Sequence, residues 1–398
     1  MKPSGPPVFL SSLGLVNALG RGKGAVAEGL FGGGAGPLPV EEGWVPNRPV
    51  RVGRVEGPLP APPPALAWAD SRTVRLVLAA LEPIRDEVEA EIARCGRDRV
   101  GVVLGTSTSG VGVMEEAILH QRAHGTLPPE FRYQGQEMGA LARFLAAHLR
   151  VAGPVYTIST ACTSGGKALA AARNLLRLGL CDAVLTGGAD CLCRLTLNGF
   201  SSLGATTLAQ GNPMSANRSG INIGEGAALF VLRREPAEVA LLGVGESSDA
   251  YHISSPDPEG GGAEAALRLA LADAGLRPDQ AGYLNLHATA TEKNDEMESR
   301  AVSRVFPDGI PCSGTKAFTG HLLGAAAATE LAFCWLTLHP HWNPEALLPP
   351  HGWDGQPDPD LPPLRLVAPG QRAPGLRVCL SNAFAFGGNN LTLAIGRI

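Results

Sequence analysis

The clearest pattern along the chain is an alternation of short apolar runs with longer, alanine-rich amphipathic stretches. The runs are β-branched or leucine-rich and bounded by glycine, which is typical of buried parallel strands at residues 100–104, 155–159, 183–186, 282–286 and 378–381. The amphipathic stretches predict helices over residues 71–93, 139–149, 164–178, 263–274 and 324–338. This alternation predicts an α/β protein of layered sheets and helices. The proline-rich segments 58–64 and 348–363 are predicted to be loops.

The composition of the chain excludes several classes of function. The 398 residues correspond to two or three domain-sized units, and 44% hydrophobic against 18% charged residues indicates a large buried core. The net charge is -4 without a basic run, so nucleic acid is not an expected partner. The start of the chain has no secretory pattern, and the most apolar stretch, 322–338, contains Glu330 and is too short to span a bilayer. We expect a soluble cytoplasmic protein with no membrane partner.

One cysteine stands out among the eight, which are too scattered for a disulfide framework. Cys191 and Cys193 form a C-x-C pair, but no cluster of zinc spacing accompanies them, so we expect no metal site. Cys162 lies where a predicted strand turns into a predicted helix, and a helix N-terminus stabilises a thiolate and lowers its pKa. A buried cysteine after a strand is also commonly inert, so the other reactive residues of the chain decide whether Cys162 is catalytic.

Three further segments contain residues that could act together with Cys162. His287 ends the predicted strand 282–286, at the edge of a sheet where α/β folds gather their active sites. Lys316 and His321 lie in a glycine-bearing loop before the long alanine-rich helix, although either histidine alone fits a capping or core role. Residues 381–390 form a strand that runs into a glycine turn, which either donates backbone N–H groups or only reverses the chain.

Together these segments resemble the elongating β-ketoacyl-acyl carrier protein synthases, condensing enzymes of fatty acid and polyketide synthesis in the thiolase superfamily. The likeness runs from residues 8–20 through 99–106, the Cys162 segment, 222–226 and 248–252 to the turn at Phe386. It implies an α/β thiolase-like fold of two pseudo-duplicated halves, 1–240 with the cysteine and 241–398 with both histidines, forming one layered α-β-α-β-α core.

The resemblance implies a 3-oxoacyl-carrier-protein synthase. Cys162 is then the nucleophile that accepts the acyl chain, while His287 and His321 hold the malonyl thioester and stabilise the enolate left by loss of carbon dioxide. We expect the helix terminus, rather than the histidines, to create the thiolate. Backbone N–H groups of Cys162 and Phe386 are expected to bind the oxyanion. The carrier protein's 4'-phosphopantetheine bears the substrates, and no other cofactor is expected.

The same resemblance assigns supporting residues and partners. Lys316 and Glu298 are expected to tune and order the site, and Phe384 to contact substrate. Thr289 and Thr291 are expected to bind the phosphopantetheine arm, or else to cap strand ends. Thr108 is expected in the acyl tunnel, unless it only bonds backbone. The implied partners are acyl carrier protein and a second subunit, in a homodimer or in a heterodimer with a synthase-like chain-length factor.

Departures from the family pattern suggest a subfamily. Ala288, Ala290 and Ala385 replace the usual glycines, and the stretch 212–220 is shorter near the expected carrier-docking region. Segments at 285–291, 297–301, 353–357 and 384–390 resemble synthases of aryl-polyene pigment clusters. Two alternatives are a chain-length factor, which lacks the reactive cysteine, and a degradative thiolase, which uses a second cysteine as base. Cys379 lies outside such a motif.

Overall fold

A large mixed sheet forms the centre of the molecule in the computed structural model, which describes residues 5–34 and 36–398. Its strand order is β13-β12-β11-β14-β15-β10-β1-β9-β7-β5-β6, with β2 beside β1. The strands of this sheet are β1 (Val8–Asn17), β2 (Gly20–Arg21), β5 (Val100–Gly105), β6 (Val155–Ile158), β7 (Ala183–Asp190), β9 (Gly226–Arg233), β10 (Val239–Ser248), β11 (Tyr283–Asn285), β12 (Pro311–Ser313), β13 (Arg365–Leu366), β14 (Val378–Ala385) and β15 (Asn389–Arg397). A small sheet joins β3 (Val40–Val45), β4 (Arg48–Gly53) and β8 (Ile223–Gly224).

The pairing pattern occurs twice. On one side β5 pairs in parallel with β6 and β7, and β9 runs antiparallel between β7 and β1. On the other side β11 pairs in parallel with β12 and β14, and β15 runs antiparallel between β14 and β10. This duplication agrees with the two-halved fold that the resemblance implies. The antiparallel strands β1, β9, β10 and β15 were not predicted.

Eleven α-helices pack around this sheet in the described part of the chain. They are α1 (Gly22–Phe31), α2 (Arg72–Leu81), α3 (Arg85–Cys95), α4 (Val111–His124), α5 (Ala140–Leu149), α6 (Ser164–Arg177), α7 (Arg194–Ser202), α8 (Gly261–Ala274), α9 (Glu292–Val305), α10 (Lys316–Thr319) and α11 (Ala326–Leu338). The predicted helix 71–93 is in fact two helices, α2 and α3, because Pro83 lies between them and has no N–H for a continuous helix.

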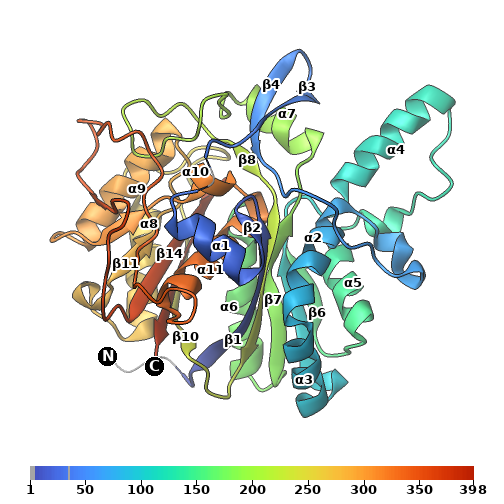
Figure 1. Ribbon diagram of the computed structural model, residues 1–398, viewed down its shortest axis with the longest axis horizontal. Helices are drawn as coiled ribbons and strands as arrows, with labels where there is room; N and C mark the ends of the chain where they lie inside the picture. The colour runs from blue at the N-terminus through green and yellow to red at the C-terminus, as the bar shows by residue number, and fades with distance from the viewer. Residues whose placement is uncertain (1–4, 35) are drawn as a thin grey trace.

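Helices α6 and α11 form the central layer of the molecule. Figure 1 shows α6 and α11 in the middle of the molecule, with α8 and α9 on one side and α2, α3 and α5 on the other. All 13 residues of α11 are buried, which explains its nearly continuous apolar sequence. At the N-terminal end of α6, a Cβ on Gly165 would lie only 2.9 Å from the Cβ of Ala328 in α11. Small residues thus let the beginnings of α6 and α11 approach each other.

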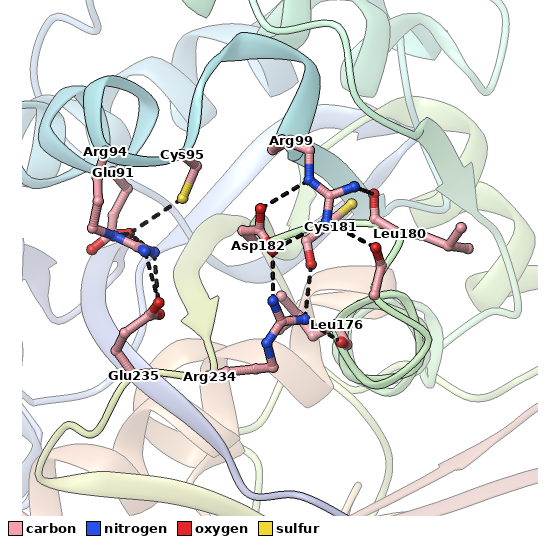
Figure 2. A network of polar contacts seen from close by, with 11 residues as sticks. Glu91, Arg94, Cys95, Arg99, Leu176, Leu180, Cys181, Asp182, Arg234 and Glu235 are labelled. Carbon is pink, nitrogen blue, oxygen red and sulfur yellow. Dashed lines mark hydrogen bonds and ion pairs between the residues drawn. The ribbon is translucent and has the colours of Figure 1, made fainter.

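A network of ion pairs lies where β5 and β7 begin, in the first half of the protein (Figure 2). Arg99 precedes β5 and Asp182 precedes β7, and the Arg99 Nε donates to Asp182 Oδ2 over 2.8 Å. Arg234, just after β9, donates to the other carboxylate oxygen over 2.5 Å. The Arg99 hydrogen bond is the main reason that the pKa of Asp182 falls to about 2. This network lies where β5 and β7 begin, so their carboxyl ends remain available for the site.

Candidate active site

Cys162 lies in a sharp turn between β6 and α6, at the predicted junction. Ala161 adopts a positive φ of 53°, a region that L-residues rarely occupy. The Ser164 hydroxyl accepts a hydrogen bond from the Thr160 N–H over 2.9 Å and helps to hold the turn. The turn directs the cysteine toward the second half of the protein, where its Sγ lies 3.0 Å from Nε2 of His321.

The two histidines reach the cysteine from separate segments. His287 follows β11, whereas the main chain of His321 is held by its N–H to Asn222 (2.7 Å) and by Gly224, which donates to its carbonyl (2.9 Å). The imidazole centroids are 5.3 Å apart, and the rings meet edge to face. One ligand-capable atom from each of Cys162, His287 and His321 lies within 4.8 Å of the others. The structure therefore brings the three predicted residues together.

Lys316 lies behind His287 rather than in the cavity. Its ammonium approaches His287 Nδ1 at 3.3 Å and also contacts the His287 carbonyl oxygen and the carboxylate of Glu330. Because the ammonium only donates, Nδ1 is the acceptor and the hydrogen of the neutral ring lies on Nε2. Glu330 was not predicted as a site residue. Its signal was the single carboxylate inside an otherwise apolar helix, where a buried charge needs a partner.

Glu298 holds the main chain of the histidine segment. Its two carboxylate oxygens accept the N–H groups of His287 and Ala288, each over 2.7 Å, and Asn382 donates to it over 3.1 Å. Burial raises the pKa of Glu298 to about 7 against the effect of these hydrogen bonds. A shift of this carboxylate would therefore move the main chain of His287.

The electrostatics differ from the expectation of a thiolate at the helix terminus. Burial raises the pKa of Cys162 to about 12, although the charge of Lys316 opposes the shift. Burial, followed by Lys316, lowers the pKa values of His287 and His321 well below the usual range. The resting site therefore pairs a neutral thiol with neutral imidazoles. His321 Nε2 lies in position to accept the thiol proton during attack.

A cavity of about 440 Å³ opens onto these groups. Its lining includes all three catalytic candidates and four residues expected to contact substrate or oxyanion: Thr289, Thr291, Phe384 and Phe386. The two threonine hydroxyls are 2.9 Å apart. The turn after β14 is fixed by Asn390, which donates to Asp249 over 2.6 Å.

Thr108 is not among the residues that line this cavity. Its buried hydroxyl donates to Asp190 over 2.7 Å and accepts the N–H of Cys191 over 3.3 Å. Asp190 also accepts from the Gly324 N–H over 2.6 Å, so it links the loop after β5 to the turn after His321. Sequence reasoning missed Asp190, whose only signal was an acidic residue at the end of an apolar run.

Two of the three alanines that replace family glycines occupy backbone conformations that favour glycine. Ala288 has φ 39° and Ala290 has φ 64°, while Ala385 lies in strand β14. Ala288 packs directly against Gly314, because a Cβ at Gly314 would lie 2.5 Å from the Ala288 Cβ. The missing side chain at Gly314 thus makes room for the added methyl at 288.

Within residues 5–34 and 36–398, no helix is both long enough and apolar enough to cross a membrane.

Comparison with known proteins identifies the family. Residues 69–237 match the model of the beta-ketoacyl synthase N-terminal domain, and residues 239–347 match that of the C-terminal domain. Nodulation protein E of Rhizobium meliloti is 34% identical over 345 residues, 84% of each chain. The 3-oxoacyl-[acyl-carrier-protein] synthase 2 of Coxiella burnetii is 29% identical over 98% of each chain. A solved structure of the ketosynthase ApeO with its chain length factor ApeC, from Xenorhabdus doucetiae, matches with 42% identity and a TM-score of 0.93, over 99% of this chain and 98% of that one. With its cysteine and two histidines at one cavity, the chain belongs to the β-ketoacyl synthase family.

Proposed function

We propose that this protein is a 3-oxoacyl-[acyl-carrier-protein] synthase that elongates an acyl chain held on Cys162. The observation that carries the proposal is the 3.0 Å approach of Cys162 Sγ to His321 Nε2, with His287 beside them at the same cavity. The family membership supports the reaction class, and the geometry supports the roles of the individual residues.

In the first half-reaction, Cys162 Sγ attacks the carbonyl carbon of the acyl thioester. His321 Nε2 takes the thiol proton and passes it to the departing pantetheine sulfur, so one thioester forms as the other breaks. The transient oxyanion is bound by backbone N–H groups of Cys162 and Phe386, both of which line the cavity. Proton transfer to a neutral imidazole suits a cysteine whose thiol pKa is raised to about 12 by burial.

In the second half-reaction, the malonyl thioester loses carbon dioxide and becomes an enolate. His287 donates from Nε2, since Lys316 occupies the side of Nδ1. The first half-reaction leaves the ring hydrogen of His321 on Nδ1, so His321 adds a second donor only after it has exchanged that hydrogen with solvent for one on Nε2. The carbanion attacks the acyl carbonyl on Cys162, forming the new carbon–carbon bond. The Cys162 thioester then breaks, and its sulfur recovers a proton as the 3-oxoacyl product leaves.

The partners follow from how the substrates arrive. Both substrates are carried by an acyl carrier protein, whose phosphopantetheine arm enters past Thr289 and Thr291 in the cavity wall. The ketosynthase ApeO, 42% identical to this chain, has been solved with its chain length factor. That likeness supports a heterodimer with a synthase-like chain-length factor ahead of a homodimer. The role in aryl-polyene synthesis rests instead on the sequence resemblance of segments 285–291, 297–301, 353–357 and 384–390.

One experiment tests the activity and its alternatives. Purified protein, alone and with a chain-length-factor subunit, is incubated with acyl-carrier proteins of graded length and malonyl-carrier protein, with mass readout of protein and product. We expect one acyl group on Cys162, loss of carbon dioxide, and a chain longer by two carbons. Cys162→Ala is the matched control and should lose acylation and elongation while retaining malonyl decarboxylation. Acylation of another cysteine contradicts the assignment, and no acylation in either preparation favours a silent partner subunit.

A further inference from the structure

A third buried histidine, outside the cavity, joins three segments around the site. His351 lies in the irregular segment between α11 and β13 and is only 4% exposed. Its Nδ1 accepts the Gly314 N–H over 2.8 Å, and its Nε2 lies 2.9 Å from the Pro213 carbonyl oxygen. The first contact requires an acceptor and the second a donor, so the ring is the neutral Nε2–H tautomer. Both of its nitrogens are fully used.

The residues that follow His351 bind the same neighbouring loop. Asp354 accepts from the Ser215 hydroxyl over 2.9 Å and from the Asn217 amide over 2.8 Å, and its own N–H donates to Asn212 over 2.9 Å. Four residues further on, Asp358 forms a partly buried ion pair with Arg218. Residues 351–358, which we call the clasp, therefore hold the 212–218 loop along its whole length.

Both segments that the clasp holds lead to His287. Gly314 lies two residues before Lys316, whose ammonium contacts His287, and Gly314 packs against Ala288. From the 212–218 loop, the Met214 N–H donates to buried Asp295 over 2.8 Å, in the helix that follows the histidine segment. Cys162, in contrast, is carried by the turn between β6 and α6, which has none of these clasp contacts.

We propose that His351 is a positioning residue for the malonyl half-reaction, and that the clasp fixes Gly314 and the 212–218 loop so that Lys316 holds His287 in place facing the malonyl thioester. The inference rests on the proposed function and deepens it. It assigns His351 to one half of the reaction, because its contacts reach His287 and do not reach the cysteine turn.

The test separates the two half-reactions in His351→Ala, His351→Asn and Asp354→Ala. We expect Cys162 acylation by acyl-carrier protein at the wild-type rate, and a loss of about tenfold or more in the kcat of malonyl-carrier decarboxylation in His351→Ala. His351→Asn should recover part of that loss, because its amide oxygen can replace Nδ1 as the acceptor for Gly314. Asp360→Ala, exposed on the same segment, serves as the matched control.

Each outcome has a definite meaning. Selective loss of decarboxylation with partial rescue by asparagine supports the proposal. Equal loss of acylation and decarboxylation means that His351 only stabilises the fold, and unchanged decarboxylation means that it positions nothing; either result overturns the proposal. If His351→Ala does not fold, His351→Asn and Asp354→Ala decide by the same ratio. Failure of the wild-type protein to acylate or decarboxylate would instead refute the proposed function.

Discussion

The contact between Gly314 and Ala288 offers a quantitative test of how this site accommodates alanine where its family has glycine. In Gly314→Ala, the new Cβ would lie 2.5 Å from the Ala288 Cβ. Non-bonded carbons prefer a separation of about 3.5–4.0 Å, so the Lys316 loop and the histidine segment must separate by about 1 Å. Overpacking of this kind costs about 1–3 kcal/mol of folding free energy. It also moves Lys316 relative to His287, so malonyl decarboxylation should slow.

A double-mutant cycle isolates that contact. Ala288→Gly removes the opposing methyl and relieves the positive φ of 39°, so the double variant should recover most of the stability lost in Gly314→Ala. Urea unfolding of the four proteins should give a favourable coupling energy of about 1 kcal/mol or more. Gly199→Ala is the control, since nothing lies within 4 Å of its added Cβ. If Gly314→Ala costs the same with and without Ala288, the packing argument is refuted.

Three further predictions concern other parts of the molecule. The depressed pKa of Asp182, about 2, stabilises the fold above its ordinary pKa and ceases to do so as the pH falls toward 2. Asp182→Asn should therefore lower the free energy of unfolding by up to about 1 kcal/mol at pH 7. The loss should shrink progressively as the pH falls below 4, which urea unfolding midpoints at several pH values would measure. His321→Ala should slow the acylation of Cys162 more than His287→Ala does, and both variants should lose malonyl decarboxylation. Equal acylation rates in the two variants, measured by mass spectrometry of quenched samples, would exclude His321 as the proton acceptor. Thr108→Phe should lower thermal stability without shortening the longest accepted acyl chain, because it loses the bond to Asp190; a shorter product profile in a stable variant would place Thr108 in the tunnel after all.

Sequence reasoning located the parts of the site that depend on local chemistry. A cysteine between a strand and a helix, and a histidine at the end of an apolar strand, are local patterns, and the structure places Cys162 and His287 at those positions. The five predicted strands and most of the helices also match, because burial leaves a direct trace in the run of apolar residues.

What the sequence did not reveal depends on partners far apart in the chain. Glu330 pairs with Lys316, Asp190 binds Thr108 and Gly324, and Asp354 binds a loop about 140 residues away. The role of a buried carboxylate can be inferred only when its hydrogen-bond donor is known, and the neighbouring sequence does not identify that donor. The raised pKa of Cys162 escaped prediction for the same reason, since burial is set by elements from both halves.

The distance between sulfur and imidazole is a property of the core as much as of the site. Cys162 precedes α6 and His321 precedes α11, and these two beginnings approach through glycine: a Cβ on Gly165 would lie 2.9 Å from Ala328 Cβ and 3.0 Å from the Gly324 carbonyl oxygen. A side chain at Gly165 would force the helices apart. Because interiors are close-packed, that displacement would lengthen the 3.0 Å contact on which proton transfer depends. Small residues at this crossing therefore connect the packing of the two halves to the reactivity of Cys162.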